Sequence, residues 1–175
     1  MYGLGGILWV ARGGLLGALV VHIMVALRLN ARNTEARPQP YAVKRDIATT
    51  SYARTMLLSG YTLAAFIAYH LAHFTFNVVH TEIGTYGDPS DPIRDVYSAY
   101  VTDFQNPLIF VLYAAAMVGV SMHLSHAVSS TFRTLGVMRG KYRAPLAKVG
   151  PAVGYVTGIG FLIPPLACLL GIVTL

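Results

Sequence analysis

Five histidines lie within stretches of this chain that are otherwise apolar. They are His22, His70, His73, His123 and His126. A neutral imidazole can ligate a metal or haem iron, pass on a proton, or hydrogen-bond to a neighbouring helix. Inside a membrane such a ring is costly unless it has a partner. What these rings bind therefore depends on the elements that hold them and on their relative depths.

The composition is typical of a membrane protein. Of 175 residues, 55% are hydrophobic and 11% are charged, whereas soluble domains average about 25% charged residues. The net charge of +6 could suggest nucleic acid, but the basic residues flank apolar runs, which indicates orientation in a bilayer instead. The single cysteine, Cys168, excludes an intrachain disulfide and a multi-cysteine metal or iron–sulfur site within this sequence.

Four apolar runs are each long enough to form a spanning helix, since about 20 residues cross a bilayer. We therefore expect an all-α polytopic transmembrane bundle that forms a single membrane domain over residues 1–175. The predicted spans cover residues 7–29, 55–79, 107–132 and 150–173. Pro107 suits the first turn of its helix, whereas Pro164 and Pro165 should kink or break the last span.

The charges of the connecting segments predict the orientation. Residues 28–54 contain six basic and two acidic side chains, and residues 133–148 contain five basic side chains and no acid. Residues 80–103 instead contain five acids and one base, together with Pro and Gly residues that mark turns. The positive-inside rule therefore places 28–54 and 133–148 in the cytoplasm and the acidic loop outside.

Depth separates the histidines. With a rise of about 1.5 Å per residue, His22 and His123 lie roughly 9 Å and 15 Å from the basic ends of their helices. By the same measure, His70 lies roughly 24 Å from the basic end of its own helix. In a core about 30 Å thick, His22 and His123 share the inner half and His70 lies in the outer half. Two histidines at similar depth on different helices can hold one haem iron from both faces, which suits electron transfer.

Each histidine also has a plainer interpretation, a hydrogen bond between helices. Three helices that each carry a deep histidine, two of them at matched depth, favour haem over that interpretation. Zinc is disfavoured because no carboxylate or thiol shares these depths.

Residues close to the predicted ligands could assist a haem. A ligating ring needs a partner for its second nitrogen, and the hydroxyl groups of Ser121, Ser125 and Ser129 are nearby in the sequence. Small residues one turn before each ligand, Ala18 and Gly119, would let a flat macrocycle approach. The same small residues are also common at ordinary contacts between membrane helices.

Five stretches of the chain are ALVVHIMVALRLNARNTEARPQPY, SYARTMLLSGYTLAAFIAYHLAHF, FNVVH, DVYSAYVTDFQNP and MHLSHAVSSTFRTLG. In this order they resemble the cytochrome b membrane-anchor subunit of succinate dehydrogenase and fumarate reductase, in its single-polypeptide, five-helix, two-haem form. The resemblance extends over almost the whole sequence. It implies a membrane bundle that binds b-type haem.

The resemblance also implies a set of haem ligands. His22 and His123 match the axial ligands of the haem nearer the cytoplasm, and His70 matches one ligand of the outer haem. The motif pattern selects His70 over His73, and His123 over His126. The family's first helix, which carries the other outer ligand, has no counterpart before Met1. Three explanations are open: a segment is missing from the sequence, a separate chain supplies the helix, or only the inner haem is bound. We expect a missing segment, because His70 and the rest of the outer half are present.

By resemblance, the chain is a non-catalytic electron-transfer subunit of a succinate:quinone oxidoreductase in the bacterial cytoplasmic membrane. It would anchor a flavoprotein subunit and an iron–sulfur subunit, which handle succinate and fumarate. It would pass electrons between the iron–sulfur subunit and a membrane quinone, expected to be menaquinone, through haem b, one or two per chain. Its other surroundings would be membrane lipid, and no nucleic-acid partner is expected.

Polar residues near the inner ends of the helices are candidate contacts for these groups. Arg32, Arg37 and Arg54 could pair with haem propionates, since guanidinium groups bind carboxylates well. Ser51 is a candidate for a quinone site.

Two alternative functions fit the same residues. Within redox proteins, the chain could be the cytochrome b of another quinone-linked enzyme, such as a hydrogenase or a formate dehydrogenase. Outside that class, it could be a non-redox membrane scaffold or a small transporter whose histidines relay protons or join helices.

Overall fold

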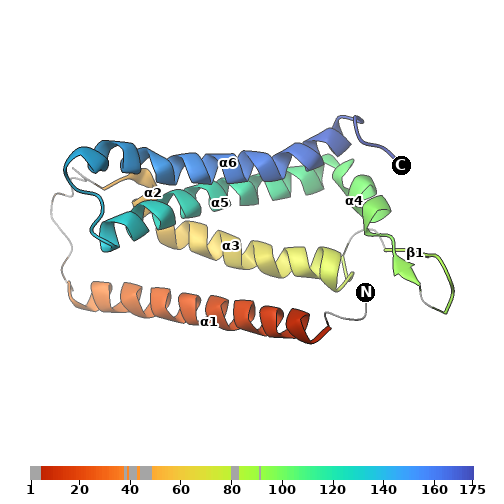
Figure 1. Ribbon diagram of the computed structural model, residues 1–175, viewed down its shortest axis with the longest axis horizontal. Coiled ribbons are helices and arrows are strands. Elements are labelled where there is room, and N and C mark those ends of the chain that lie inside the picture. Colours follow the sequence, from red (N-terminus) through yellow and green to blue (C-terminus); the bar gives the residue numbers. More distant parts are fainter. Residues whose placement is uncertain (1–4, 38, 40–42, 44–48, 80–82, 91) are drawn as a thin grey trace. The chain divides into compact units, whose positions relative to one another are not determined.

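A computed structural model of the chain describes residues 5–37, 39, 43, 49–79, 83–90 and 92–175. The chain divides into two compact units, residues 1–47 and 48–175. Figure 1 labels helices of both. The prediction of a single membrane domain stays a prediction.

The first unit is built on one long helix, α1, which runs over Gly5–Glu35. It contains the predicted span 7–29 and continues for a further turn and a half beyond it. Gly13 and Gly14, which have low helix propensity, lie inside this helix without ending it. None of its described residues is buried within the chain, and its apolar stretch is long enough to cross a membrane.

The second unit contains the remaining elements. They are the helices α2 (Ser51–Arg54), α3 (Met56–His70), α4 (Val96–Phe104), α5 (Pro107–Thr134) and α6 (Arg143–Leu169), a π-helical turn η1 (Leu71–Thr75), a 3₁₀ turn η2 (Gly140–Tyr142) and the short strands β1 (Thr85–Tyr86) and β2 (Ile93–Arg94). Among the described residues of both units, four helical segments are long and apolar enough to span a membrane. The predicted all-α bundle with four spans is therefore confirmed.

Helix α6 corrects two expectations. It begins at Arg143, seven residues before the predicted start at 150, and it continues through Pro164 and Pro165 to Leu169. The proline pair therefore does not break this helix. Apolar surroundings explain the tolerance, because neighbouring helices and local adjustments can satisfy the carbonyl groups that a proline frees.

The segment predicted as an acidic loop, 80–103, is more ordered than expected. Strands β1 and β2 pair antiparallel, with Thr85 opposite Arg94. Helix α4 follows, and the Asp95 carboxylate caps it by accepting a hydrogen bond from the Ser98 backbone N–H at 3.1 Å. Hydrogen bonding to the side chain of Ser98, and then to its backbone, lowers the pKa of Asp95 below its ordinary value. His80, Glu82 and Asp91 of the predicted loop lie outside the described residues.

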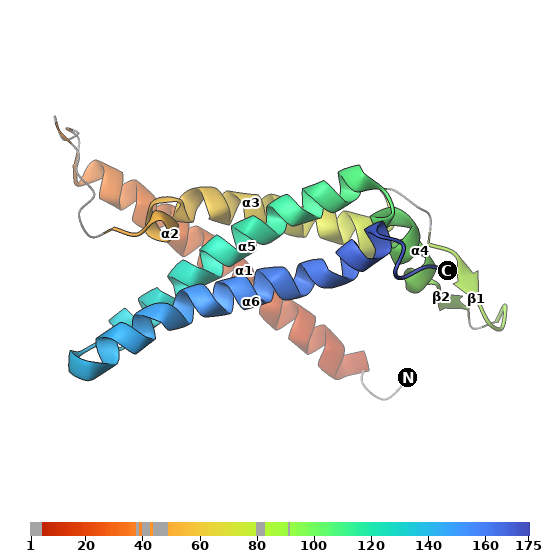
Figure 2. The same ribbon diagram turned by 90° about the horizontal axis from the view of Figure 1, so that it is seen from above.

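Helix α5 is the centre of the second unit. It packs against α3 on one side and α6 on the other, and Figures 1 and 2 both show it between them. We call the two ends of this bundle the α2 end and the α4 end, after the short helix at each. The buried core gathers at the α4 end, where Val101, Phe104, Ile109, Tyr113 and Cys168 form one cluster.

Candidate functional site

Helices α5 and α6 meet through a repeated contact between small residues. In this serine–glycine contact, Ser121, Ser125 and Ser129 of α5 lie against Gly150, Gly154 and Gly158 of α6. A Cβ atom placed on any of these glycines would overlap a serine hydroxyl or a serine backbone oxygen. The backbones are therefore as close as small residues allow, which is how many membrane helices associate.

This contact corrects the role expected for the three serines. The Ser125 hydroxyl is buried and donates to the Ser121 backbone carbonyl at 2.6 Å, within its own helix. The serines therefore serve the packing of α5 on α6, and the structure gives His123 and His70 hydroxyl partners elsewhere, Ser59 and Tyr113.

Gly119 likewise serves helix packing. A Cβ atom there would lie 3.1 Å from Thr62 Cγ2 and 3.3 Å from Leu63 Cδ1 of α3. The space beside Gly119 is thus filled by α3. The expectation that this glycine makes room for a macrocycle is wrong.

His123 finds its partner on α3. Its Nδ1 lies 3.2 Å from the hydroxyl oxygen of Ser59, which is itself buried. The Ser59 hydroxyl donates its one proton to the Met56 carbonyl at 3.0 Å, so toward His123 it acts as the acceptor. The proton of a neutral His123 ring then resides on Nδ1, which leaves the lone pair on Nε2.

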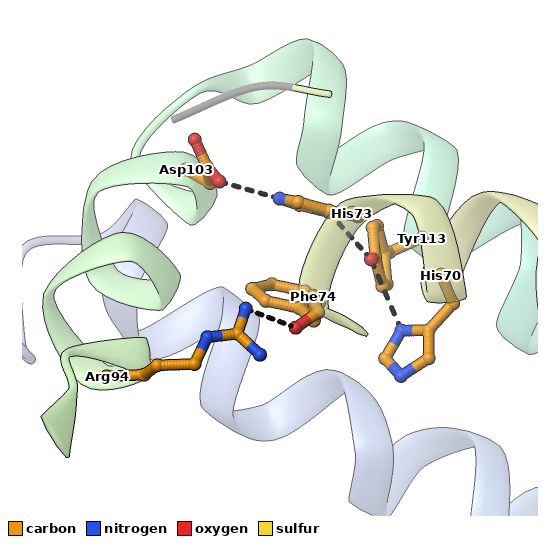
Figure 3. A network of polar contacts seen from close by, with 6 residues as sticks. All are labelled: His70, His73, Phe74, Arg94, Asp103 and Tyr113. Carbon is orange, nitrogen blue, oxygen red and sulfur yellow. Dashed lines mark hydrogen bonds and ion pairs between the residues drawn. The ribbon is translucent and has the colours of Figure 1, made fainter. Parts of the chain in front are cut away.

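A second histidine cluster lies at the α4 end (Figure 3). The hydroxyl of Tyr113, on α5, lies 2.8 Å from His73 Nδ1 and 3.3 Å from His70 Nδ1. The other ring nitrogen of His73, Nε2, lies 2.6 Å from Oδ2 of Asp103 on α4. His73 and Asp103 are 1% and 3% exposed, so this pair is enclosed by protein.

The two neighbouring histidines are thus used differently. Both ring nitrogens of His73 are occupied by protein groups. His70 bonds to Tyr113 through Nδ1, its side chain is exposed, and Figure 3 shows Nε2 directed away from the network. Of the two, only His70 therefore presents a nitrogen suitable for an iron atom. Ser59, level with His123, precedes His70 by eleven residues, about 16 Å along a helix.

Aromatic rings and an arginine hold the cluster in place. The ring of His73 stacks on that of Phe74, with centroids 3.8 Å apart and planes at 20°. Residues 71–75 form the π-helical turn, and the guanidinium of Arg94 donates to the backbone carbonyls of Phe74 and Thr75 at 3.3 Å and 3.4 Å. Arg94 therefore provides hydrogen bonds to carbonyl groups at the end of the span and connects strand β2 to the π-helical turn.

Asp103 overturns one argument drawn from the sequence. The case against zinc assumed that no carboxylate shares the depth of the histidines, yet Asp103 contacts His73 directly. The sequence predicts that Asp103 belongs to an acidic loop outside the membrane, whereas in the structure it is buried. Across the described residues, however, no group of three or more His, Cys, Asp or Glu side chains could hold a metal ion.

The remaining predicted residues are distributed over both units. His22 and Arg32 lie on α1, and Arg37 follows that helix. His22 and His123 belong to different units, and their pairing on one haem stays a prediction. Arg54 ends α2 and donates to the Ser51 hydroxyl at 3.3 Å.

Ser51 also lines a groove at the α2 end. The groove has a volume of about 740 Å³ and is bordered by Ser51 and Tyr52, by Met122 of α5 and by Tyr155 of α6. The hydroxyl groups of Tyr52 and Tyr155 lie 2.8 Å apart, and this hydrogen bond raises the pKa of Tyr52 above its ordinary value. An apolar groove with a few hydroxyl groups at one end can accept a ring that bears carbonyl oxygens.

Sequence reasoning missed Ser59, Tyr113 and Asp103 as site residues. Tyr113 and Ser59 looked like ordinary members of apolar spans. A signal for Asp103 was present, because Tyr97, Tyr100 and Phe104 recur at helical spacing around it. That spacing predicts a helix with an apolar face rather than a loop.

His123 and His70 share one arrangement of their ring nitrogens. A haem iron with two axial imidazoles needs neutral rings, each with the proton on one nitrogen held by a hydrogen bond. His123 and His70 both have Nδ1 bonded to a hydroxyl group of the second unit.

No protein-family model matches the chain, and no curated protein and no solved structure is found to be similar to it.

Proposed function

We propose that the chain is a haem b-binding electron-transfer subunit of a membrane-bound succinate:quinone oxidoreductase. The observation that carries the proposal is the shared arrangement of His123 and His70. Each lies on a predicted span and has Nδ1 bonded to a hydroxyl group, Ser59 for one and Tyr113 for the other. This arrangement supports Nε2 as the ligand atom in both cases.

In this proposal the residues of the chain bind the haem, orient it and shield it from water. His123 pairs with His22 on one haem, and His70 supplies one ligand of a second haem whose other ligand comes from elsewhere. A haem held in this way supplies reversible one-electron oxidation and reduction. The apolar helices exclude water, and Arg32, Arg37 and Arg54 are the proposed partners of the propionates.

The same proposal assigns the quinone and the partner subunits. The Ser51 groove, with Tyr52 and Tyr155 at its border, is the proposed quinone site, and its hydroxyl groups could donate to quinone carbonyl oxygens. Menaquinone is the expected quinone. The basic segments 28–54 and 133–148 would face the cytoplasm of a bacterium and dock the iron–sulfur and flavoprotein subunits.

The test is haem content per chain by a pyridine haemochrome assay on the chain purified in detergent. We expect a reducible b-type spectrum, and His123→Ala should lose one haem. The matched control is His126→Ala, which makes the same change one helical turn away and should keep full haem content. A colourless wild-type chain, or equal haem content in both variants, would contradict the haem assignment. Co-purification with a flavoprotein and an iron–sulfur protein that oxidise succinate distinguishes this enzyme from other quinone-linked enzymes.

A proton-conducting membrane protein is a second candidate, favoured by the hydrogen-bonded series that runs from the buried Asp103 through His73 and Tyr113 to the exposed His70. Ionisable groups inside membrane proteins often mark proton paths. A colourless chain that carries protons across vesicle membranes, and loses that activity in Asp103→Asn, would select this function instead.

A further inference from the structure

The hydroxyl of Tyr113 lies between two imidazole nitrogens and has one proton to give. It contacts His73 Nδ1 at 2.8 Å and His70 Nδ1 at 3.3 Å. If the proton is donated to one ring, the oxygen can only accept from the other. The proton positions of His73 and His70 are therefore linked through this single hydroxyl group.

The Asp103 carboxylate sets the direction of the series. Its Oδ2 lies 2.6 Å from His73 Nε2, within hydrogen-bonding distance. An ionised carboxylate can only accept, so Nε2 of His73 carries a proton. A neutral His73 then has its lone pair on Nδ1 and accepts the proton of the Tyr113 hydroxyl. The Tyr113 oxygen in turn accepts from His70, whose proton must lie on Nδ1.

We infer that Tyr113, oriented by the His73–Asp103 pair, is a positioning residue that holds His70 with its proton on Nδ1 and its lone pair on Nε2. The inference rests on the proposed function in one respect: it takes haem iron as the group that binds this lone pair. His70 Nε2 points away from the network and the side chain is exposed, so the lone pair is presented outside the cluster (Figure 3).

Burial makes this arrangement specific. The side chains of His73, Asp103 and Tyr113 are at most 6% exposed, so water cannot easily replace one hydrogen bond by another. His73 is also fixed by its stacking on Phe74. A free histidine exchanges between its two neutral tautomers, and a ring held in one of them needs no rearrangement before it binds a metal.

The test reads the tautomers directly. The full chain is labelled with ¹⁵N-histidine in cells that cannot make haem, and ¹⁵N NMR spectra are recorded in detergent, with His70→Gln and His73→Gln used for assignment. We expect His70 to carry its proton on Nδ1 and His73 to carry its proton on Nε2. A His70 ring with its proton on Nε2, or a His73 ring protonated on both nitrogens, would overturn the inference.

Two variants test the link between the rings. In Asp103→Asn the amide can donate to His73 Nε2, as happens when the aspartate of a serine-protease triad is replaced, so both histidine protons should move to the opposite nitrogens. In Tyr113→Phe the link is cut, and His70 should become a mixture of tautomers. Tyr100→Phe removes a phenol hydroxyl from the same aromatic cluster and should change neither ring. An unchanged His70 in both Asp103→Asn and Tyr113→Phe would refute the link.

Haem content separates this inference from the proposed function. A wild-type chain that shows the expected tautomers but takes up no haem in normal cells supports the positioning role and refutes the haem assignment. A chain that binds haem but shows the opposite His73 tautomer refutes the positioning role alone. The wild-type spectrum decides the tautomer even if a variant fails to fold, which circular dichroism would reveal.

Discussion

Helix α5 has two faces that contain similar residues. One face packs closely on α6, and the other forms hydrogen bonds with side chains of other helices. Toward α6, the serine–glycine contact brings two backbones together, and the hydroxyl of Ser125 is used within its own helix. Toward α3 and α4, His123 and Tyr113 reach side chains of other helices. A hydroxyl group near a histidine in the sequence is therefore no guide to its partner, because the face on which each residue lies decides what it can touch.

The largest expected effect comes from enlarging a glycine on the α6 side. In Gly154→Ala the new methyl group would overlap the backbone carbonyl oxygen of Ser121, so the helices must separate. We expect a loss of about 3 kcal/mol in the free energy of unfolding, at the upper end for overpacked cores. Unfolding in mixed detergent, followed by circular dichroism, measures it.

The control for that experiment is Gly160→Ala, because nothing lies within 4 Å of the added methyl group there. The same change in the same helix should be neutral or slightly stabilising, since alanine favours a helix. Equal losses in the two variants would mean that the close contact of α5 and α6 is wrong.

A smaller effect is expected from the hydroxyl groups on the two faces. Ser59→Ala removes the acceptor of His123 Nδ1 and leaves a half-buried N–H without it, which should cost about 1–2 kcal/mol. Ser125→Ala removes only a bond within α5 and should cost less. If haem is bound, its absorption spectrum should change in Ser59→Ala and not in Ser125→Ala. The reverse order would place the ligand partner on the wrong face.

The smallest effect is a pH dependence confined to the α4 end. Burial, with a contribution from the nearby Cys168, raises the pKa of Tyr100 to about 12 from its ordinary value of 10.0. The folded protein therefore holds this proton more tightly than the unfolded chain. The resulting stability is fully present below pH 10 and is lost as the pH rises through about 12. Thermal melts in that range should fall less steeply in Tyr100→Phe than in the wild type, and parallel curves would contradict the assignment.

The spans could be predicted because hydropathy over 20 residues reports the bilayer rather than the details of packing. The start of α6 was missed by seven residues because Arg143 and Lys148 interrupt the apolar pattern, although a helix can extend beyond the membrane core. Of the predicted kink or break at Pro164 and Pro165, the break is absent for a related reason. The rules for prolines in water overstate their effect where other groups satisfy the freed carbonyls.

The site was less predictable than the fold. Depth placed His70 and His123 at different levels from the sequence alone, and the choice of His70 over His73 came from resemblance. That choice stays a prediction, and the structure adds one argument for it: Asp103 and Tyr113 occupy both ring nitrogens of His73. These two residues are 30 and 40 positions from His73 in the sequence, and no local pattern links them to it. The serines were misassigned because their i, i+4 repeat was not matched with the same repeat of glycines in α6.

The π-helical turn at Leu71–Thr75 adds one residue to the end of the span that carries His70 and His73. A π turn holds one residue more than an α turn, and the turn includes His73 but not His70. In a regular helix both rings would follow the same spiral; here the additional residue changes the direction of His73 relative to His70. The two rings can therefore approach one hydroxyl group from different sides. The π turn is equivalent to the insertion of one residue into a regular α-helix, and the arrangement of the two rings depends on that residue.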